Sequence, residues 1–138
     1  DGAILPGDIV ISRSPTGSKA DILVTVRDPG ADHLFGAYVW LEYGSDRRNP
    51  FGHQRFVVSL PPSSSKVIRA SVTLTGPYAW VLAQVIQGSE HGPSEGVSDD
   101  PTPGDSCALL AVNSKAAPAD LLAAFKERAK MSCQVFLR

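Results

Sequence analysis

This sequence has no long apolar run, almost no net charge and a single methionine. No apolar segment approaches the roughly 18–20 residues that a membrane-spanning helix needs, so membrane insertion is not expected. The thirteen basic and fourteen acidic side chains nearly cancel, to a net charge of −1. This balance excludes nucleic-acid binding through an overall basic field. The length of 138 residues suits one compact domain, and we predict a single domain over residues 1–138.

Cysteine is also rare, and the two present, Cys107 and Cys133, do not form a Cys-x-x-Cys pair. A disulfide between them would close a loop around the one segment with helical periodicity and stabilise the fold by roughly 3 kcal/mol. The alternative is two buried thiols in a cytoplasmic protein. The chain begins Asp1-Gly2-Ala3 without methionine and is rich in Ser, Pro and Gly, which favours the disulfide. We therefore expect a secreted or cell-surface protein in its mature form, after removal of a leader.

Residues 1–87 consist of short apolar segments separated by turn signals. Ile22, Val24 and Val26 alternate with their neighbours, which is typical of a strand with one buried face. Residues 78–86 are apolar on both faces, as expected of a central strand covered on each side. Strands are predicted at residues 9–11, 22–27, 37–43, 56–60, 67–74 and 78–86. This spacing without helical periodicity predicts an all-β sandwich.

Residues 88–106 form a Gly-, Pro- and Ser-rich segment with five carboxylates and no lysine or arginine. A loop of this length inside a compact domain is either functional or simply solvated. We select Glu90, His91, Asp99 and Asp100 as its candidate contact residues. Asp99, Asp100 and Asp105 could bind a calcium ion, because calcium prefers carboxylate oxygens as ligands. The spacing does not match an EF-hand, so no cofactor is expected, with calcium kept as an alternative.

Residues 107–138 are predicted to form a strand, a helix and a tail. Ala108 to Val112 is apolar enough to return to the sheet. Pro118 suits the first turn of a helix, where Asp120 adds a favourable negative charge. The helix presents one apolar stripe, formed by Leu121, Leu122, Phe125 and Ala129. We expect this stripe to pack on the sandwich as a lid.

Three segments carry a resemblance to a known family. Ile22 to Pro29 corresponds to a second strand and the proline after it, Tyr38 to Tyr43 to a third strand, and Leu74 to Tyr78 to the turn and tyrosine before a sixth strand. In these features the chain resembles a fibronectin type III domain over about half of its length. The family's core tryptophan on the second strand is missing, and neither cysteine lies where an immunoglobulin domain has its pair. The resemblance implies an immunoglobulin-like or fibronectin type III-like β-sandwich, here with an added C-terminal helix, and a binding or spacing role.

Catalytic motifs are missing from the sequence. His33, His53 and His91 lie in expected loops and lack metal-ligand spacing. A pair of Cys107 with His91 is conceivable, but no nucleophile elbow occurs. Glu42 is the one carboxylate expected against a sheet face, and no second carboxylate accompanies it for glycoside hydrolysis. A non-catalytic role is therefore favoured, with a small hydrolase that uses loop-borne residues as an alternative.

Aromatic side chains provide the better candidate site. Tyr38 and Trp40 share one face of their predicted strand, and Val39, Leu41 and Tyr43 share the other. Exposed flat rings suit stacking on sugars or docking a partner, provided that one of these faces is left uncovered.

Two arginines, Arg47 and Arg48, stand at the expected tip of the following loop, where they could bind carboxylates or phosphates. The candidate binding residues are Arg47, Arg48, Glu90, His91, Asp99, Asp100 and Trp40. We predict a non-catalytic module of an exported or cell-surface protein that recognises a protein or a glycan. The alternative is a structural subunit of a surface or virion assembly, held together by edge strands and tails.

Overall fold

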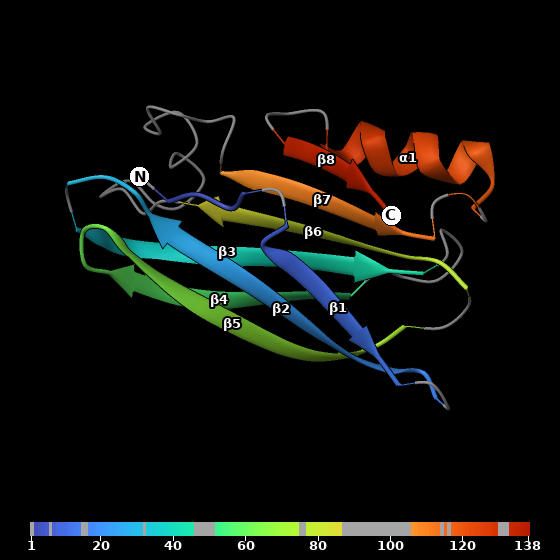
Figure 1. Cartoon of the computed structure of the whole chain (residues 1–138), viewed down its shortest axis with the longest axis horizontal. Helices are drawn as coiled ribbons and strands as arrows, with labels where there is room; N and C mark the ends of the chain where they lie inside the picture. The colour runs from blue at the N-terminus through green and yellow to red at the C-terminus, as the bar shows by residue number, and fades with distance from the viewer. Residues whose placement is uncertain are drawn as a thin grey trace.

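In the residues that it describes, the computed structural model places eight strands and one helix, most of them joined by short connections (Figure 1). It describes residues 2–5, 7–14, 17–31, 33–45, 52–74, 77–86, 106–113, 115, 117–129 and 133–138, without the side chains of residues 125, 126, 128 and 129. The elements are β1 (Ile9–Arg13), β2 (Lys19–Asp28), β3 (Leu34–Gly44), β4 (Gly52–Leu60), β5 (Ser64–Thr73), β6 (Ala79–Ile86), β7 (Cys107–Val112), α1 (Ala119–Ala129) and β8 (Cys133–Leu137).

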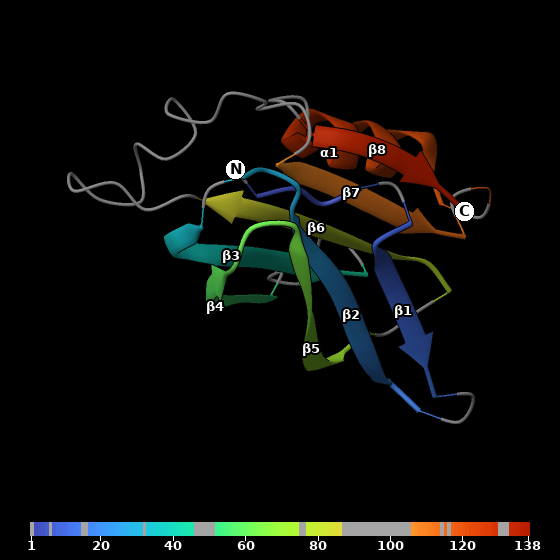
Figure 2. The same ribbon diagram turned by 60° about the vertical axis from the view of Figure 1, so that its left-hand side comes forward.

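The strands form two sheets. One has three strands in the order β1-β2-β5, and the other has five in the order β4-β3-β6-β7-β8. All pairings are antiparallel except that of β7 with β8, which is parallel. Figures 1 and 2 show the sheets as two layers, with α1 beside β7 and β8. The prediction of an all-β chain with one C-terminal helix is confirmed.

The main core lies between the two sheets. Ile22, Val24 and Val26 of β2 are buried and face Val39 and Leu41 of β3 across it, within one cluster of buried apolar side chains. The alternation predicted for β2 is therefore confirmed. In β3 the inward face is the aliphatic one, so Tyr38, Trp40 and Glu42 point to the opposite, outer side of the five-stranded sheet.

A second apolar cluster lies on that outer side, beneath α1. Trp80 and Leu82 of β6 and Leu109 of β7 pack there with Leu121 of the helix. Both faces of β6 and β7 are thus covered, which confirms the expectation of a central strand at residues 78–86. Leu122 contacts the same cluster, whereas the side chains of Phe125 and Ala129, predicted for the same stripe, lie outside the described ones.

The predicted disulfide between Cys107 and Cys133 is present. The two cysteines are the first residues of β7 and β8 and are direct partners in the parallel register. The bond therefore ties β8 to β7, the strand it pairs with in the described part of the sheet.

The expectation that all three histidines lie in loops is wrong for His53. This residue is the second of β4, which begins four residues before the predicted strand at 56–60. Because β4 is an edge strand with an uncovered outer face, its first half is polar and only Phe56, Val58 and Leu60 show an apolar pattern. His33 immediately precedes β3, and His91 lies outside the described residues.

An ion pair on the outer face of the three-stranded sheet gives a testable pH dependence. Asp21 accepts hydrogen bonds from Arg69 at 2.7 Å and from Ser71 at 2.9 Å. These bonds, that of Arg69 first, lower the pKa of Asp21 below its ordinary value of 3.8. We expect Arg69→Met to raise this pKa toward 3.8, as measured by NMR titration of the Asp21 carboxyl carbon.

The pKa of Asp21 is lower in the folded protein than in the unfolded chain. The ion pair therefore stabilises the fold at pH values above the ordinary pKa of 3.8. This contribution is lost as the pH falls through the folded-state pKa. Lys66→Met, at an exposed position of the same strand, serves as the control and should leave the titration unchanged. An equal pKa of Asp21 in both variants would contradict the assigned cause.

Candidate functional site

The outer side of the five-stranded sheet is divided into a covered half and an open half. α1 covers β6 to β8, as described above, but does not extend over β3 and β4 (Figure 1). We call the part of this side that α1 does not cover the open face. It comprises three cross-strand rows, which are Val57–Tyr38–Ile86, Arg55–Trp40–Gln84 and His53–Glu42, each set by the pairing of β3 with β4 and β6.

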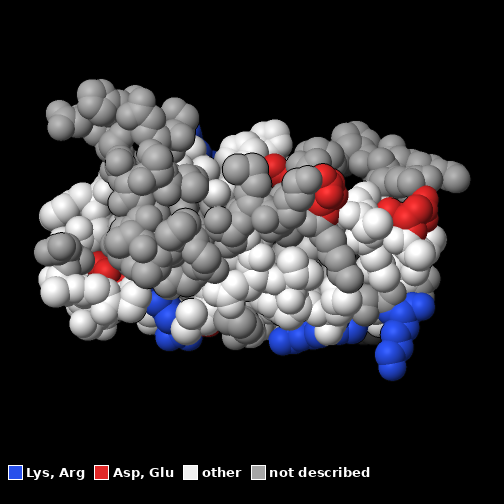
Figure 3. Space-filling model, turned by 90° about the horizontal axis from the view of Figure 1, so that it is seen from above, with Lys and Arg blue, Asp and Glu red and all other residues white. Residues whose placement is uncertain are grey.

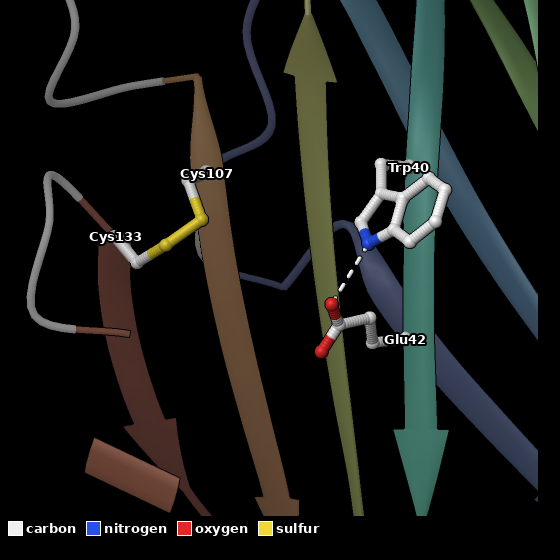
Figure 4. The surroundings of a disulfide bond; sticks show 4 residues. All are labelled: Trp40, Glu42, Cys107 and Cys133. Carbon is white, nitrogen blue, oxygen red and sulfur yellow. Dashed lines mark hydrogen bonds between the residues drawn. A yellow bond between two sulfur atoms is a disulfide. The ribbon is translucent and has the colours of Figure 1, made fainter. Parts of the chain in front are cut away.

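Trp40 lies at the centre of the open face and is partly buried. Its ring stacks on that of His53, with centroids 4.9 Å apart and planes 18° from parallel. Its indole Nε1 donates a hydrogen bond to Glu42 Oε1 at 2.9 Å. Figure 4 shows the Trp40 and Glu42 side chains projecting from β3 toward β6, with the indole nitrogen facing the carboxylate. The orientation of the ring is therefore fixed before any ligand arrives.

Arg55 occupies the β4 end of the same row. Its guanidinium lies over the Tyr38 ring, 5.1 Å from the centroid, in a cation–π contact. Within the described part of the chain Arg55 forms no ion pair and no side-chain hydrogen bond. A planar group with five N–H donors is thus held in place and left available at the surface.

A second aromatic pair adjoins the open face where β3 begins. His33 stacks on Phe35 with centroids 3.8 Å apart, and its Nε2 lies 3.1 Å from Ser59 Oγ. The register of β3 against β4 shifts between Leu34 and Ala37, and Gly36 in this bulge has φ of 62°, which glycine adopts without steric cost. The bulge leaves Phe35 69% exposed, so the aromatic surface extends along β3.

Of the predicted binding residues, the structure describes Trp40 alone. Arg47 and Arg48 belong to the segment 46–51 between β3 and β4, and it lies outside the described residues. The same holds for Glu90, His91, Asp99 and Asp100, and for the calcium candidate Asp105, in the segment 87–105 between β6 and β7.

His53 and Arg55, the two polar neighbours of the Trp40 and Tyr38 rings, were not predicted as site residues. A signal for Arg55 exists in the sequence. Phe56, Val58 and Leu60 alternate along the strand predicted at residues 56–60. If these three face the core, the same alternation places Arg55 and Val57 on the outward side. Which residues of β3 they would meet depends on the strand register, which the sequence does not specify.

Other kinds of site find little support in the described part of the chain. No group of three or more His, Cys, Asp or Glu side chains within it could hold a metal ion. Two surface hollows, one of about 240 Å³ beside Arg13 and Asp21 and one of about 410 Å³ beside Tyr43 and Thr73, are lined by residues outside the open face. In Figure 3 most of the Lys and Arg side chains of the described residues gather along one edge of the view, while most of the Asp and Glu side chains lie elsewhere.

No protein-family model matches the chain, and no curated protein sequence matches it. Within the part that the structure describes, no helix has the length and hydrophobicity needed to cross a bilayer. Any function must therefore be inferred from the geometry of the open face and from the disulfide.

Proposed function

We propose that this chain is a non-catalytic binding module of an exported or cell-surface protein, and that the open face binds its ligand, a protein or a glycan. The observation that carries the proposal is the contrast between the two tryptophans on one side of one sheet. Trp80 is 3% exposed beneath α1, whereas Trp40 is only partly buried, does not belong to the cluster under α1, and is held by His53 and Glu42. A fixed, accessible ring offers a large contact area at a low cost in conformational entropy.

The strand order supports an immunoglobulin-like or fibronectin type III-like sandwich as the scaffold. Without β8, the two sheets have three strands (β1-β2-β5) and four strands (β4-β3-β6-β7). A seven-strand sandwich has the same numbers of strands in its two sheets. Both parts that follow β7 in the chain, α1 and β8, are then additions to this scaffold. Such a scaffold is compatible with binding, but this part of the proposal is analogy between folds.

The disulfide supports the exported location. Disulfides persist in oxidising compartments and are rare in the cytosol, where thiols are kept reduced. Because the bond between Cys107 and Cys133 joins two adjacent strands of the sheet, it belongs to the architecture of the folded chain.

The proposal is tested by NMR titration of the backbone amides with a panel of neutral oligosaccharides, acidic oligosaccharides and short acidic or proline-rich peptides. We expect at least one member to shift amides of β3 and β4, and Trp40→Ala to weaken that binding by at least tenfold, as for the central residue of an interface. Val67→Ala, which truncates a side chain that is 58% exposed on β5, is the matched control and should leave the affinity unchanged.

Two outcomes would overturn the proposal. One is a panel in which no member shifts the amides of the open face. The other is a ligand whose shifts map to the three-stranded sheet and whose affinity Trp40→Ala does not change.

A further inference from the structure

We propose that the ligand of the open face is an acidic glycan, a chain of sugars that carry carboxylates, such as uronic acids. It would lie across the strands along the row Arg55–Trp40–Gln84, with one carboxylate on Arg55. This inference rests on the proposed function and narrows it to one ligand class.

The geometry of the row fits a short stretch of sugar chain. Arg55, Trp40 and Gln84 are direct partners on β4, β3 and β6. Since neighbouring strands lie about 4.8 Å apart, the row is about 10 Å long, comparable with a disaccharide. Beyond Gln84 the row continues to Cys107 and its disulfide, which Figure 4 shows on the far side of β6 from Trp40. The row is open at β4, which is an edge strand.

The three side chains offer complementary chemistry. The Trp40 ring stacks on His53 with one face, and its other face would provide the flat apolar surface for the C–H face of a sugar ring. The partly buried Gln84 forms no side-chain hydrogen bond within the described part of the chain, so its amide can both donate to and accept from hydroxyl groups. The guanidinium of Arg55 lies over Tyr38 and forms no hydrogen bond or ion pair within the described part of the chain, so it can match a carboxylate with two parallel hydrogen bonds.

The distribution of charge favours a glycan with spaced carboxylates. Among the described residues of the open face, Arg55 is the one arginine or lysine, and Glu42 is the one carboxylate. Glu42 accepts the indole N–H of Trp40 and keeps its negative charge on the side away from Tyr38. A neutral glycan would leave Arg55 unused. A run of consecutive acidic residues in a peptide would place further carboxylates close to Glu42.

The shape of the face also favours sugars over a peptide. Peptides that bind sheets either add a strand at an edge or insert side chains into pockets. The open face is a broad side of the sheet, and neither of the hollows described above is lined by its residues. A sugar ring stacks on an exposed aromatic ring without entering a pocket.

The test compares tetrasaccharides of galacturonate, glucuronate or mannuronate with the same tetrasaccharides after chemical reduction of their carboxyl groups. Tetraglutamate is the peptide probe, and binding to the full chain is measured by NMR titration and calorimetry. We expect at least one uronate to bind at least tenfold more tightly than its reduced form. Arg55→Gln should bring this ratio close to one, and Trp40→Ala should abolish binding of both forms. Lys66→Gln, which removes an exposed cation from β5, should preserve the ratio.

The remaining outcomes separate this inference from the proposed function. A reduced form that binds as tightly as its uronate, or tetraglutamate binding more tightly than every uronate, overturns the acidic glycan. In both cases, if Trp40→Ala still weakens the binding, the proposal that the open face binds the ligand stands. An unchanged ratio in Arg55→Gln likewise overturns the role of Arg55. If no member of either panel binds the open face, both proposals fail.

Discussion

Replacing both cysteines by alanine, Cys107→Ala with Cys133→Ala, is expected to lower the free energy of unfolding by about 3 kcal/mol. In the chain-entropy model this is the effect of releasing a loop with a sequence separation of 26 residues. For a chain of this size the loss corresponds to a fall in melting temperature on the order of 10 °C. Urea and thermal denaturation followed by circular dichroism measure both quantities.

The loss of stability should be largest in β8. Among the described strands, β8 pairs with β7 alone, and Val135 and Leu137 remain 39% and 44% exposed. Without the disulfide we expect β8 amides to lose protection from hydrogen exchange, while those of β2 and β3 keep theirs. Wild-type protein under reducing conditions is the control and should behave like the double variant. A loss below about 1 kcal/mol, or unchanged protection in β8, would show that packing alone holds the strand.

Much of the fold could be predicted because its signals are local. The alternation of Ile22, Val24 and Val26 identifies a strand with one buried face, whichever strands lie beside it. The doubly apolar character of residues 78–86 reflects burial on two sides, by the opposite sheet and by α1. The disulfide followed from the scarcity of cysteine and from the position of the pair around the helix.

The rest of the architecture depends on contacts between distant residues. Both faces of residues 38–43 carry large side chains, so the sequence does not decide whether Trp40 or Val39 points inward. That choice follows from where β4 and β6 pair with β3. A tail was expected after the helix, but its pairing with β7 as the parallel strand β8 depends on the path of the chain around α1.

The candidate site shows the same limit more strongly. Trp40 was selected from its residue type, yet the selection carried no information about its neighbours. His53 and Arg55 reach Trp40 and Tyr38 because β4 folds back on β3 in one particular register. A shift of that register by one residue would turn both side chains to the opposite face.

The substitution Trp80→Ala is expected to destabilise the protein by about 3–5 kcal/mol, the range for removing a fully packed aromatic side chain. Trp80 is 3% exposed and packs in the cluster that joins β6 and β7 to α1. The backbone of β3 also approaches it closely, since a Cβ added at Gly44 would lie 2.9 Å from the indole Nε1. Equilibrium unfolding in urea gives the change in stability.

The matched substitution Trp40→Ala removes the same side chain from the same side of the same sheet, where no helix covers it. We expect this substitution to cost about 1 kcal/mol, because only the His53 stack, the Glu42 hydrogen bond and partial burial are lost. The comparison tests the division of the outer side into a covered and an open half. If Trp40→Ala destabilised the fold as much as Trp80→Ala, Trp40 would be a core residue, and a loss of binding in that variant would no longer identify a ligand face. A small cost instead allows the binding experiments with Trp40→Ala to be interpreted as effects on recognition, since the scaffold that presents Arg55 and Gln84 stays folded.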